Sequence, residues 1–195
     1  MMRSLRMTNT INLFDLHSQK NLISDVISKR MEVVLNHGQF IQGPEVGELE
    51  EKLAQYVGVS HCITCGNGTD AIMVALMALG VKPGDEILVP SFTYAASAEP
   101  ISLLGAVPVF VNVDERTFNF DINDAKTKVS ENTVGIVAAS LYGQCADYES
   151  INQFSKENGL FVLEDGAQSF GAKIHDKKSC SFTDISTTSF FPTNL

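Results

Sequence analysis

The sequence has 195 residues, of which 44% are hydrophobic and 19% charged, a composition typical of a globular domain and not of a disordered chain. Its formal net charge of −9, from 14 Lys and Arg against 23 Asp and Glu, argues against general nucleic-acid binding, which needs many basic side chains. No apolar run approaches the roughly 20 residues that span a bilayer, and residues 1–12 lack the apolar core of a secretory signal, so we expect a cytoplasmic protein.

Helical spacing of apolar residues alternates along the chain with short apolar runs. We predict helices over residues 22–34, 45–56, 69–79, 94–104, 121–128 and 148–158. We predict strands over residues 61–64, 86–89, 107–113, 134–139, 160–163 and 185–191. Short, continuous apolar strands separated by helices favour an α/β fold with a mainly parallel sheet and helices on both faces. In such sheets ligands bind at the carboxyl ends of the strands.

The cysteines do not indicate a disulfide framework, because a chain of this size carries only four of them. Cys62 and Cys65 form a Cys-x-x-Cys pair, which could be redox-active or half of a zinc site. No second pair and no His cluster completes a metal site. We therefore interpret the pair as two small, partly buried residues and predict no metal.

The turn from Cys65 to Ala71 lies between a predicted strand and a predicted helix. Gly66 and Gly68 let the backbone turn tightly and approach a ligand. The unpaired N–H groups at the start of a helix suit a phosphate, and Thr69 can add a hydroxyl donor. A plain turn capped by Thr69 or Asp70 is the alternative, and the segment taken alone favours it.

Three other strand ends carry polar or aromatic candidates. Asp165 and its neighbour Glu164 end a buried strand, where a carboxylate is costly unless it is paired. A cation such as a protonated pyridine nitrogen would explain Asp165, and an ordinary turn would explain it equally. Tyr94 could stack on a flat ring or pack on the sheet. Ser189 could donate to a phosphate or simply face a neighbour.

The order of these motifs resembles the DegT/DnrJ/EryC1/StrS family of pyridoxal-phosphate (PLP) dependent sugar aminotransferases, from about Ile11 to the last residue. The resemblance implies the fold type I, or aspartate aminotransferase-like, large domain. The motifs that carry it are Gly43-Pro44, Gly66-Asn67-Gly68-Thr69-Asp70-Ala71, Pro83-Gly84-Asp85-Glu86, Pro90-Ser91-Phe92-Thr93-Tyr94, Leu141-Tyr142-Gly143-Gln144, Glu164-Asp165-Gly166-Ala167-Gln168-Ser169 and Ser189-Phe190-Phe191-Pro192-Thr193.

The resemblance also implies roles for individual residues, and none of these roles follows from composition or spacing. Asp165 would pair with the pyridinium nitrogen of PLP and act as a catalytic residue. Tyr94 would stack on the ring, and Gln168 would hydrogen-bond its phenolic oxygen. The residues expected to hold the phosphate are Gly68, Thr69 and Ser189.

Within the family, residues 140–147, 168–172 and 178–180 look most similar to one subgroup. Its members aminate the 3-keto group of a UDP-linked 2-acetamido hexuronic acid during O-antigen sugar synthesis. The resemblance therefore implies a UDP-linked keto sugar and an amino donor, expected to be glutamate, as partners. It also implies a homodimer with the site at the subunit interface.

The chain departs from the family pattern near its end. The lysine that bonds covalently to PLP should follow Thr193, but the sequence reads Phe191-Pro192-Thr193-Asn194-Leu195. Asn-Leu commonly follows that lysine, so either a modified lysine is not written in the sequence or the chain lacks it. We expect an N-terminal helical segment over 1–40 and an incomplete PLP-binding domain over 41–195, with the rest of the sheet and the small C-terminal domain missing.

Two other interpretations stay open beside the aminotransferase. One is a non-catalytic PLP-fold fragment, or a structural or regulatory subunit, without the lysine. The other is an unrelated doubly wound enzyme that binds a nucleotide at residues 66–69, with an acidic residue about 20 positions later. Asp85 and Glu86 are near that distance but lie at a turn before a strand, which argues against the second interpretation.

Overall fold

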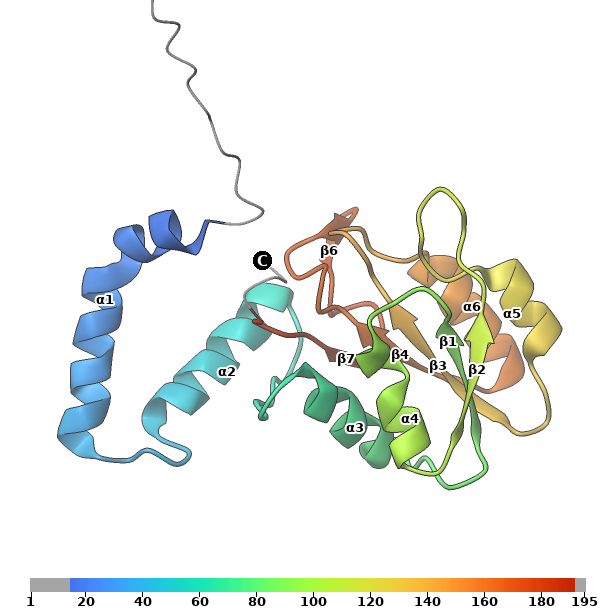
Figure 1. Ribbon diagram of the computed structural model, residues 1–195, viewed down its shortest axis with the longest axis horizontal. Helices are drawn as coiled ribbons and strands as arrows, with labels where there is room; N and C mark the ends of the chain where they lie inside the picture. The colour runs from blue at the N-terminus through green and yellow to red at the C-terminus, as the bar shows by residue number, and fades with distance from the viewer. Residues whose placement is uncertain (1–14, 192–195) are drawn as a thin grey trace, which may run out of the picture. The chain divides into compact units, whose positions relative to one another are not determined.

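The computed structural model describes residues 15–191, which fall into two compact units, Met1–Pro44 and Glu45–Leu195 (Figure 1). In the first unit, helix α1 (Leu16–His37) is capped at its N-terminus by Asp15, whose side chain accepts a hydrogen bond from the Ser18 amide at 3.0 Å. It ends at Gly38, which adopts a left-handed conformation with φ 68°. The predicted helix over 22–34 lies inside α1. The expected lysine position after Thr193 lies outside the described residues.

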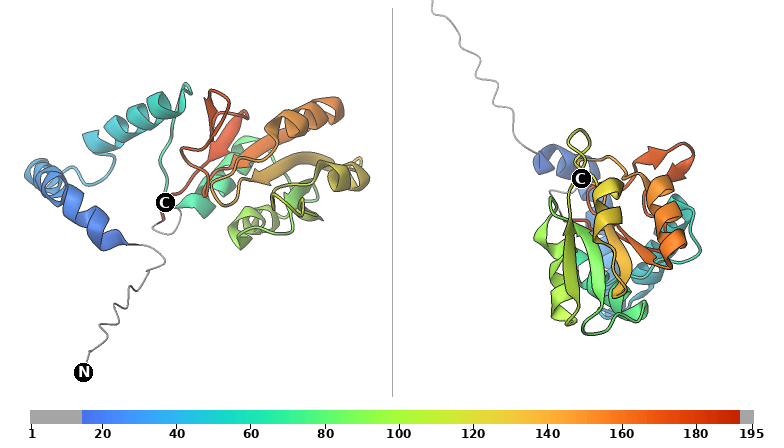
Figure 2. Two further views of the ribbon diagram at one scale, coloured as in Figure 1. Left: turned by 90° about the horizontal axis from the view of Figure 1, so that it is seen from above. Right: turned by 90° about the vertical axis from the view of Figure 1, so that its right-hand side faces the viewer.

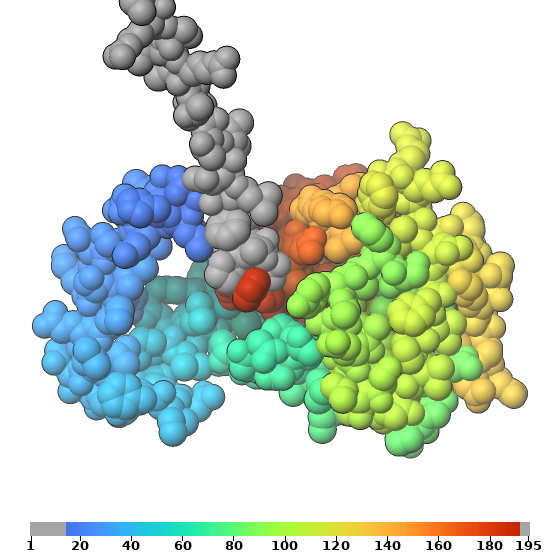
Figure 3. Space-filling view, viewed as in Figure 1, coloured from blue at the N-terminus to red at the C-terminus, as the bar shows by residue number. Residues whose placement is uncertain are grey.

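The second unit is built on a five-stranded parallel sheet with the strand order β2-β1-β3-β4-β7. The predicted α/β class with a mainly parallel sheet is therefore confirmed. β2 lies at one edge, where its residues reach the surface, drawn in yellow-green in Figure 3. The strands are β1 (Glu86–Pro90), β2 (Val107–Val111), β3 (Thr133–Ala139), β4 (Phe161–Asp165) and β7 (Ile185–Thr187).

Helices cover both faces of the sheet (Figure 2). Along β1, Ile87 and Val89 face one core with α3 and α4, whereas Leu88 faces the other core with α5 and α6. This alternation explains why the strands read as continuous apolar runs, since both faces are buried. The helices are α2 (Pro44–Val57), α3 (Gly68–Ala78), η1 (Ala95–Ser97), α4 (Glu99–Leu103), α5 (Ile122–Lys128) and α6 (Tyr148–Asn158).

The predicted strand over 61–64 is wrong, because this segment pairs with no strand among the described residues. Instead, the backbone amide and the hydroxyl of Thr64 both donate to Glu50 Oε1, at 2.8 and 2.9 Å. Ile63 is 84% exposed. An apolar run forms a strand only where a neighbouring strand satisfies its backbone groups, and here a carboxylate from α2 does so instead.

Three other predictions need smaller corrections. The helix predicted over 94–104 is split into η1 and α4, because Pro100 has no amide N–H and suits the first turn of α4. The strands predicted over 107–113 and 185–191 end earlier, at Val111 and Thr187. A short antiparallel hairpin of β5 (Lys173–Ile174) and β6 (Lys177–Lys178) was not predicted.

Gly135 in β3 allows the neighbouring strand to pack closely. A Cβ atom there would lie 2.2 Å from Cζ of Phe161 on β4, so we expect Gly135→Ala to lower the free energy of unfolding by about 3 kcal/mol through overpacking. Gly47 in α2 has no atom near its missing Cβ, and Gly47→Ala should raise it by about 0.5–1 kcal/mol. Urea unfolding of both variants measures the difference. Equal stabilities would contradict the packing seen at Gly135.

No helix within residues 15–191 combines the length and the apolarity needed to cross a membrane.

Candidate cofactor site

A cavity of about 310 Å³ opens at the carboxyl ends of β1, β3, β4 and β7, beside the first turn of α3. Because these strands are parallel, their carboxyl ends meet at one edge of the sheet. All six residues proposed from the sequence line this cavity: Gly68, Thr69, Tyr94, Asp165, Gln168 and Ser189. The structure therefore brings together residues that are up to 121 positions apart in the sequence, the separation of Gly68 and Ser189.

The first turn of α3 presents free amides and a hydroxyl to the cavity. Asn67 caps the helix, since its Oδ1 accepts the Asp70 amide at 2.9 Å; the cap is therefore neither Thr69 nor Asp70. Amides in a first turn have no intrahelical partner. The Thr69 hydroxyl also has no hydrogen-bond partner within residues 15–191. Together with the positive end of the helix dipole, these donors make the turn suitable for a phosphate.

Ser189 lies against this turn only because residue 68 is a glycine. A Cβ at Gly68 would lie 3.0 Å from Cβ and 3.4 Å from Oγ of Ser189. Ser189 Oγ accepts the Phe191 amide at 3.2 Å, which leaves its own proton free to be donated. The hydroxyl therefore adds a donor to the same place as the helix start.

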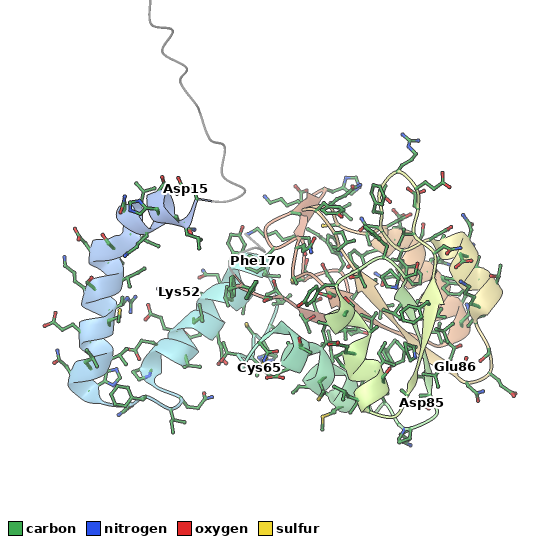
Figure 4. All side chains as sticks on the ribbon, in the orientation of Figure 1. Asp15, Lys52, Cys65, Asp85, Glu86 and Phe170 are labelled. Atoms are coloured by element: carbon green, nitrogen blue, oxygen red, sulfur yellow. The ribbon has the colours of Figure 1, made fainter. Side chains whose placement is uncertain are left out.

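A chain of aromatic rings supports the segment that carries Ser189. The neighbouring Phe190 packs edge-on against Phe170 with 5.4 Å between ring centroids. Phe170 in turn stacks on Tyr56 of α2, also with 5.4 Å between ring centroids. Figure 4 labels Phe170 beside the end of that helix. Although β7 is only three residues long, these contacts fix where its continuation runs.

Asp165 ends β4 as a buried carboxylate without a cationic partner in the described residues. Its Oδ2 accepts from Ser97 Oγ at 2.7 Å, and its Oδ1 accepts from the Ala167 amide at 3.2 Å. Burial raises the pKa of Asp165, while the two hydrogen bonds oppose this. A buried carboxylate that faces a cavity is stabilised by a cation placed there, and this favours the ligand-binding interpretation over an ordinary turn.

Gln168 is oriented by a tight turn that follows β3. Its Oε1 accepts the Tyr142 amide at 3.2 Å, and its backbone carbonyl accepts the Gly143 amide at 2.9 Å. Tyr142 and Gly143 both have positive φ, 55° and 75°, as the two central residues of a type I′ turn do. With Oε1 used as an acceptor, the side-chain NH₂ group remains as a donor to a ligand oxygen.

Tyr94 follows β1 and is 74% exposed, and its ring meets no other aromatic ring among residues 15–191. It does not pack on the sheet as the simpler interpretation expected. A ring at the wall of a cavity can stack on a flat ligand.

Two hydrogen-bonding groups beside the site were not predicted from the sequence: Ser97, and the partners of Glu164. Ser97 binds Asp165 although 68 positions separate them, and no local pattern indicates such a contact. Glu164 points away from the cavity and is fully buried, where it accepts from Ser179 Oγ at 2.8 Å, the Cys180 amide at 2.9 Å and Ser186 Oγ at 3.3 Å. The side chains of Glu164 and Asp165, which are adjacent in the chain, therefore point to opposite faces of β4.

The cysteines show no metal site. All four are free; Cys62 is partly buried, and Cys65 is exposed in the loop before α3, as labelled in Figure 4. Residues 15–191 contain no group of three His, Cys, Asp or Glu side chains arranged to hold a metal ion.

The chain matches known proteins over most of its length. Residues 21–195 match the model of the DegT/DnrJ/EryC1/StrS aminotransferase family. The UDP-2-acetamido-2-deoxy-3-oxo-D-glucuronate aminotransferase of Pseudomonas aeruginosa is 50% identical over 93% of the chain and 51% of that protein. The chain thus spans about half the length of this curated relative.

Solved structures show the same likeness. The crystal structure of a DegT/DnrJ/EryC1/StrS aminotransferase from Brucella abortus superposes with a TM-score of 0.88 at 37% identity, over 94% of the chain and 51% of that structure. NtdA from Bacillus subtilis with bound cofactor PMP superposes with a TM-score of 0.81 at 32% identity, over 87% and 38%. These likenesses confirm the fold type I large domain expected from the sequence.

Proposed function

Because this chain belongs to the DegT/DnrJ/EryC1/StrS aminotransferase family, we propose that it forms the cofactor-binding half of a PLP-dependent nucleotide-sugar aminotransferase. The observation that carries this proposal is the buried carboxylate of Asp165, which faces a cavity and has no cationic partner in the described residues. A protonated ring nitrogen is the cation that would balance it.

The residues present fit PLP at three separate points. The start of α3 and Ser189 offer donors to a phosphate, and a Cβ at Gly68 would crowd that place. Asp165 offers a carboxylate to the ring nitrogen. Gln168 keeps an NH₂ group for a ring oxygen. A phosphate, a basic ring nitrogen and a phenolic oxygen are the three polar features of this cofactor.

When bound, PLP would supply an electron sink for proton transfer at the carbon that bears the amino group of the substrate. The chain's own residues make that possible by holding and polarising the ring. Asp165 would hold the proton on the ring nitrogen, Tyr94 would contact the ring, and Gln168 would donate to its phenolic oxygen. Gly68, Thr69 and Ser189 would hold the phosphate, since they line the same cavity.

The substrate we propose is a UDP-linked 2-acetamido hexuronic acid with a 3-keto group, used in O-antigen synthesis. The name of the Pseudomonas aeruginosa relative, 50% identical, supports this choice. We propose glutamate as the amino donor and a homodimer as the working form. We place the protein in the cytoplasm, since its four free thiols suit a reducing compartment.

The test uses pyridoxamine phosphate (PMP), which needs no lysine to bind. The purified protein loaded with PMP is mixed with UDP-2-acetamido-2-deoxy-3-oxo-D-glucuronate, and the absorbance change from PMP to PLP is followed together with the mass of the amino sugar formed. Conversion supports the proposal. Binding of PMP without conversion of this keto sugar would reject aminotransferase activity of this chain by itself on that substrate and favour the non-catalytic alternative. The intact mass of the untreated protein, compared with that of the 195 residues in the sequence, separately shows whether the chain carries one more lysine. Peptide mapping after PLP addition and borohydride reduction shows whether the labelled lysine follows Thr193.

We expect Gly68→Ala to weaken PMP binding about tenfold, because the new methyl displaces Ser189 from the phosphate and costs one charge-assisted hydrogen bond. Pyridoxamine, which lacks the phosphate, serves as the control ligand and should bind both proteins equally. Titration by absorbance measures all four affinities. If pyridoxamine affinity fell as much as PMP affinity, Gly68 would not act through the phosphate.

A further inference from the structure

Ser97 is a fully buried serine in η1 and does not line the cavity. Its Oγ lies 2.7 Å from Oδ2 of Asp165 and 3.0 Å from Oγ1 of Thr93. Thr93 does line the cavity. The three side chains thus form a line from the cavity wall, through the protein interior, back to the carboxylate that faces the cavity.

The direction of the protons in this line follows from the charge on Asp165. An ionised carboxylate can only accept hydrogen bonds, so the Ser97 hydroxyl must donate to it. Ser97 Oγ then has only lone pairs left for Thr93, and the Thr93 hydroxyl must donate to Ser97. Such a chain polarises each member, which strengthens the bond to the carboxylate.

The second oxygen of Asp165 is held more loosely. Within residues 15–191, Oδ1 accepts only the Ala167 amide, at 3.2 Å, and keeps a lone pair for a ligand. The described residues offer no cation that could share the charge. Of the two hydrogen bonds to the Asp165 carboxylate, the one from the Ser97 hydroxyl, at 2.7 Å, is therefore the shorter.

We propose that Ser97, supported by Thr93, is a positioning residue that orients the Asp165 carboxylate and keeps it ionised toward the cavity. It thereby holds the proton on the ring nitrogen of the bound cofactor. This inference rests on the proposed function, because it needs a cofactor with a basic ring nitrogen in the cavity. Ser97 itself touches neither cofactor nor substrate.

Two measurements with the purified protein and PMP test the proposal: the dissociation constant, and the ¹⁵N chemical shift of PMP labelled at the ring nitrogen. Ser97→Ala should weaken PMP binding about tenfold and move the ¹⁵N shift toward the unprotonated value, since a charged hydrogen bond is lost. Ser155→Ala is the matched control. Ser155 is also buried, but its hydroxyl donates to the Asn152 carbonyl in α6, at 2.9 Å.

A second pair of variants keeps the test valid if Ser97→Ala folds poorly. Thr93→Val retains the shape but removes the hydroxyl, and we expect about threefold weaker binding with a smaller ¹⁵N change in the same direction. Thr93→Ser retains the hydroxyl and should behave like the wild type.

The outcomes separate the inference from the function on which it rests. Wild-type protein that binds no PMP would overturn both. The inference alone would be overturned if the wild-type protein bound PMP and both Ser97→Ala and Thr93→Val had the same PMP affinity and the same ¹⁵N chemical shift as the wild type. Weaker binding with an unchanged ¹⁵N shift would also overturn it, because Ser97 would then act on packing only.

Discussion

Asp165→Asn is expected to weaken PMP binding by a factor of about 100 to 4000, while the thermal stability of the cofactor-free protein is retained. The loss follows from breaking a buried ion pair, which costs about 3–5 kcal/mol, with every 1.4 kcal/mol worth about tenfold in affinity. Stability should survive because Asn has nearly the same shape, and because burial raises the pKa of Asp165, so that its charge opposes folding of the empty site. Absorbance titration and thermal unfolding provide the two readouts.

The control for this change is Asp121→Asn. Asp121 caps α5, where its side chain accepts the Asn123 amide at 2.8 Å, and Asn caps a helix as well as Asp. It should leave PMP affinity and stability unchanged. Equal PMP affinity of Asp165→Asn and wild type would show that no cation of the ligand meets Asp165, and the proposed orientation of the ring would be wrong.

Glu164→Ala is expected to lower the free energy of unfolding by about 3 kcal/mol. The change leaves a cavity and removes the acceptor of the Cys180 amide and the Ser179 hydroxyl, and a buried donor without a partner costs about 1–3 kcal/mol. Glu164→Gln keeps an oxygen at that place and should be tolerated. Urea unfolding of the cofactor-free protein measures both variants.

Comparison of Glu164→Gln with the wild type also predicts how the free energy of unfolding depends on pH, and the sign follows from the burial of the Glu164 charge. Burial raises the pKa of Glu164 in the folded protein, against the opposing hydrogen bonds from Cys180, Ser179 and Ser186. The folded state therefore binds more protons than the unfolded state between the ordinary glutamate value of about 4.3 and the raised value. Stability in that window falls as pH rises. Glu164→Gln removes this slope, so its stability relative to wild type should increase from pH 5 to pH 8.

Asp165 contributes a slope of the same sign to both proteins, since burial raises its pKa as well. Only the difference between Glu164→Gln and wild type therefore reports on Glu164. A difference that stays constant between pH 5 and pH 8 would mean that Glu164 is ionised equally in the folded and unfolded states, contrary to its burial.

The sequence by itself determined most of the sheet and the place of the site. Continuous apolar runs predicted β1, β3 and β4, because strands buried on both faces must be apolar throughout. Asp165 was recognised as a residue after a strand, where parallel sheets bind ligands, and Ser189 was predicted within the last strand, which ends earlier, at Thr187. Local rules suffice for these features, since they depend on neighbours within a few positions.

Only the tertiary structure decided which side chains meet. The contact of Ser97 with Asp165 depends on a 3₁₀ turn after β1 lying beside the end of β4, although β3 pairs between these two strands. The orientation of Gln168 depends on a turn after β3 with two positive φ angles. Likewise, residues 61–64 have a strand-like pattern but pair with no strand among the described residues, and Thr64 donates to Glu50 instead. Hydrogen-bond partners of this kind come from elements far apart in the chain. They meet because of the order of the strands in the sheet, and no local sequence pattern encodes that order.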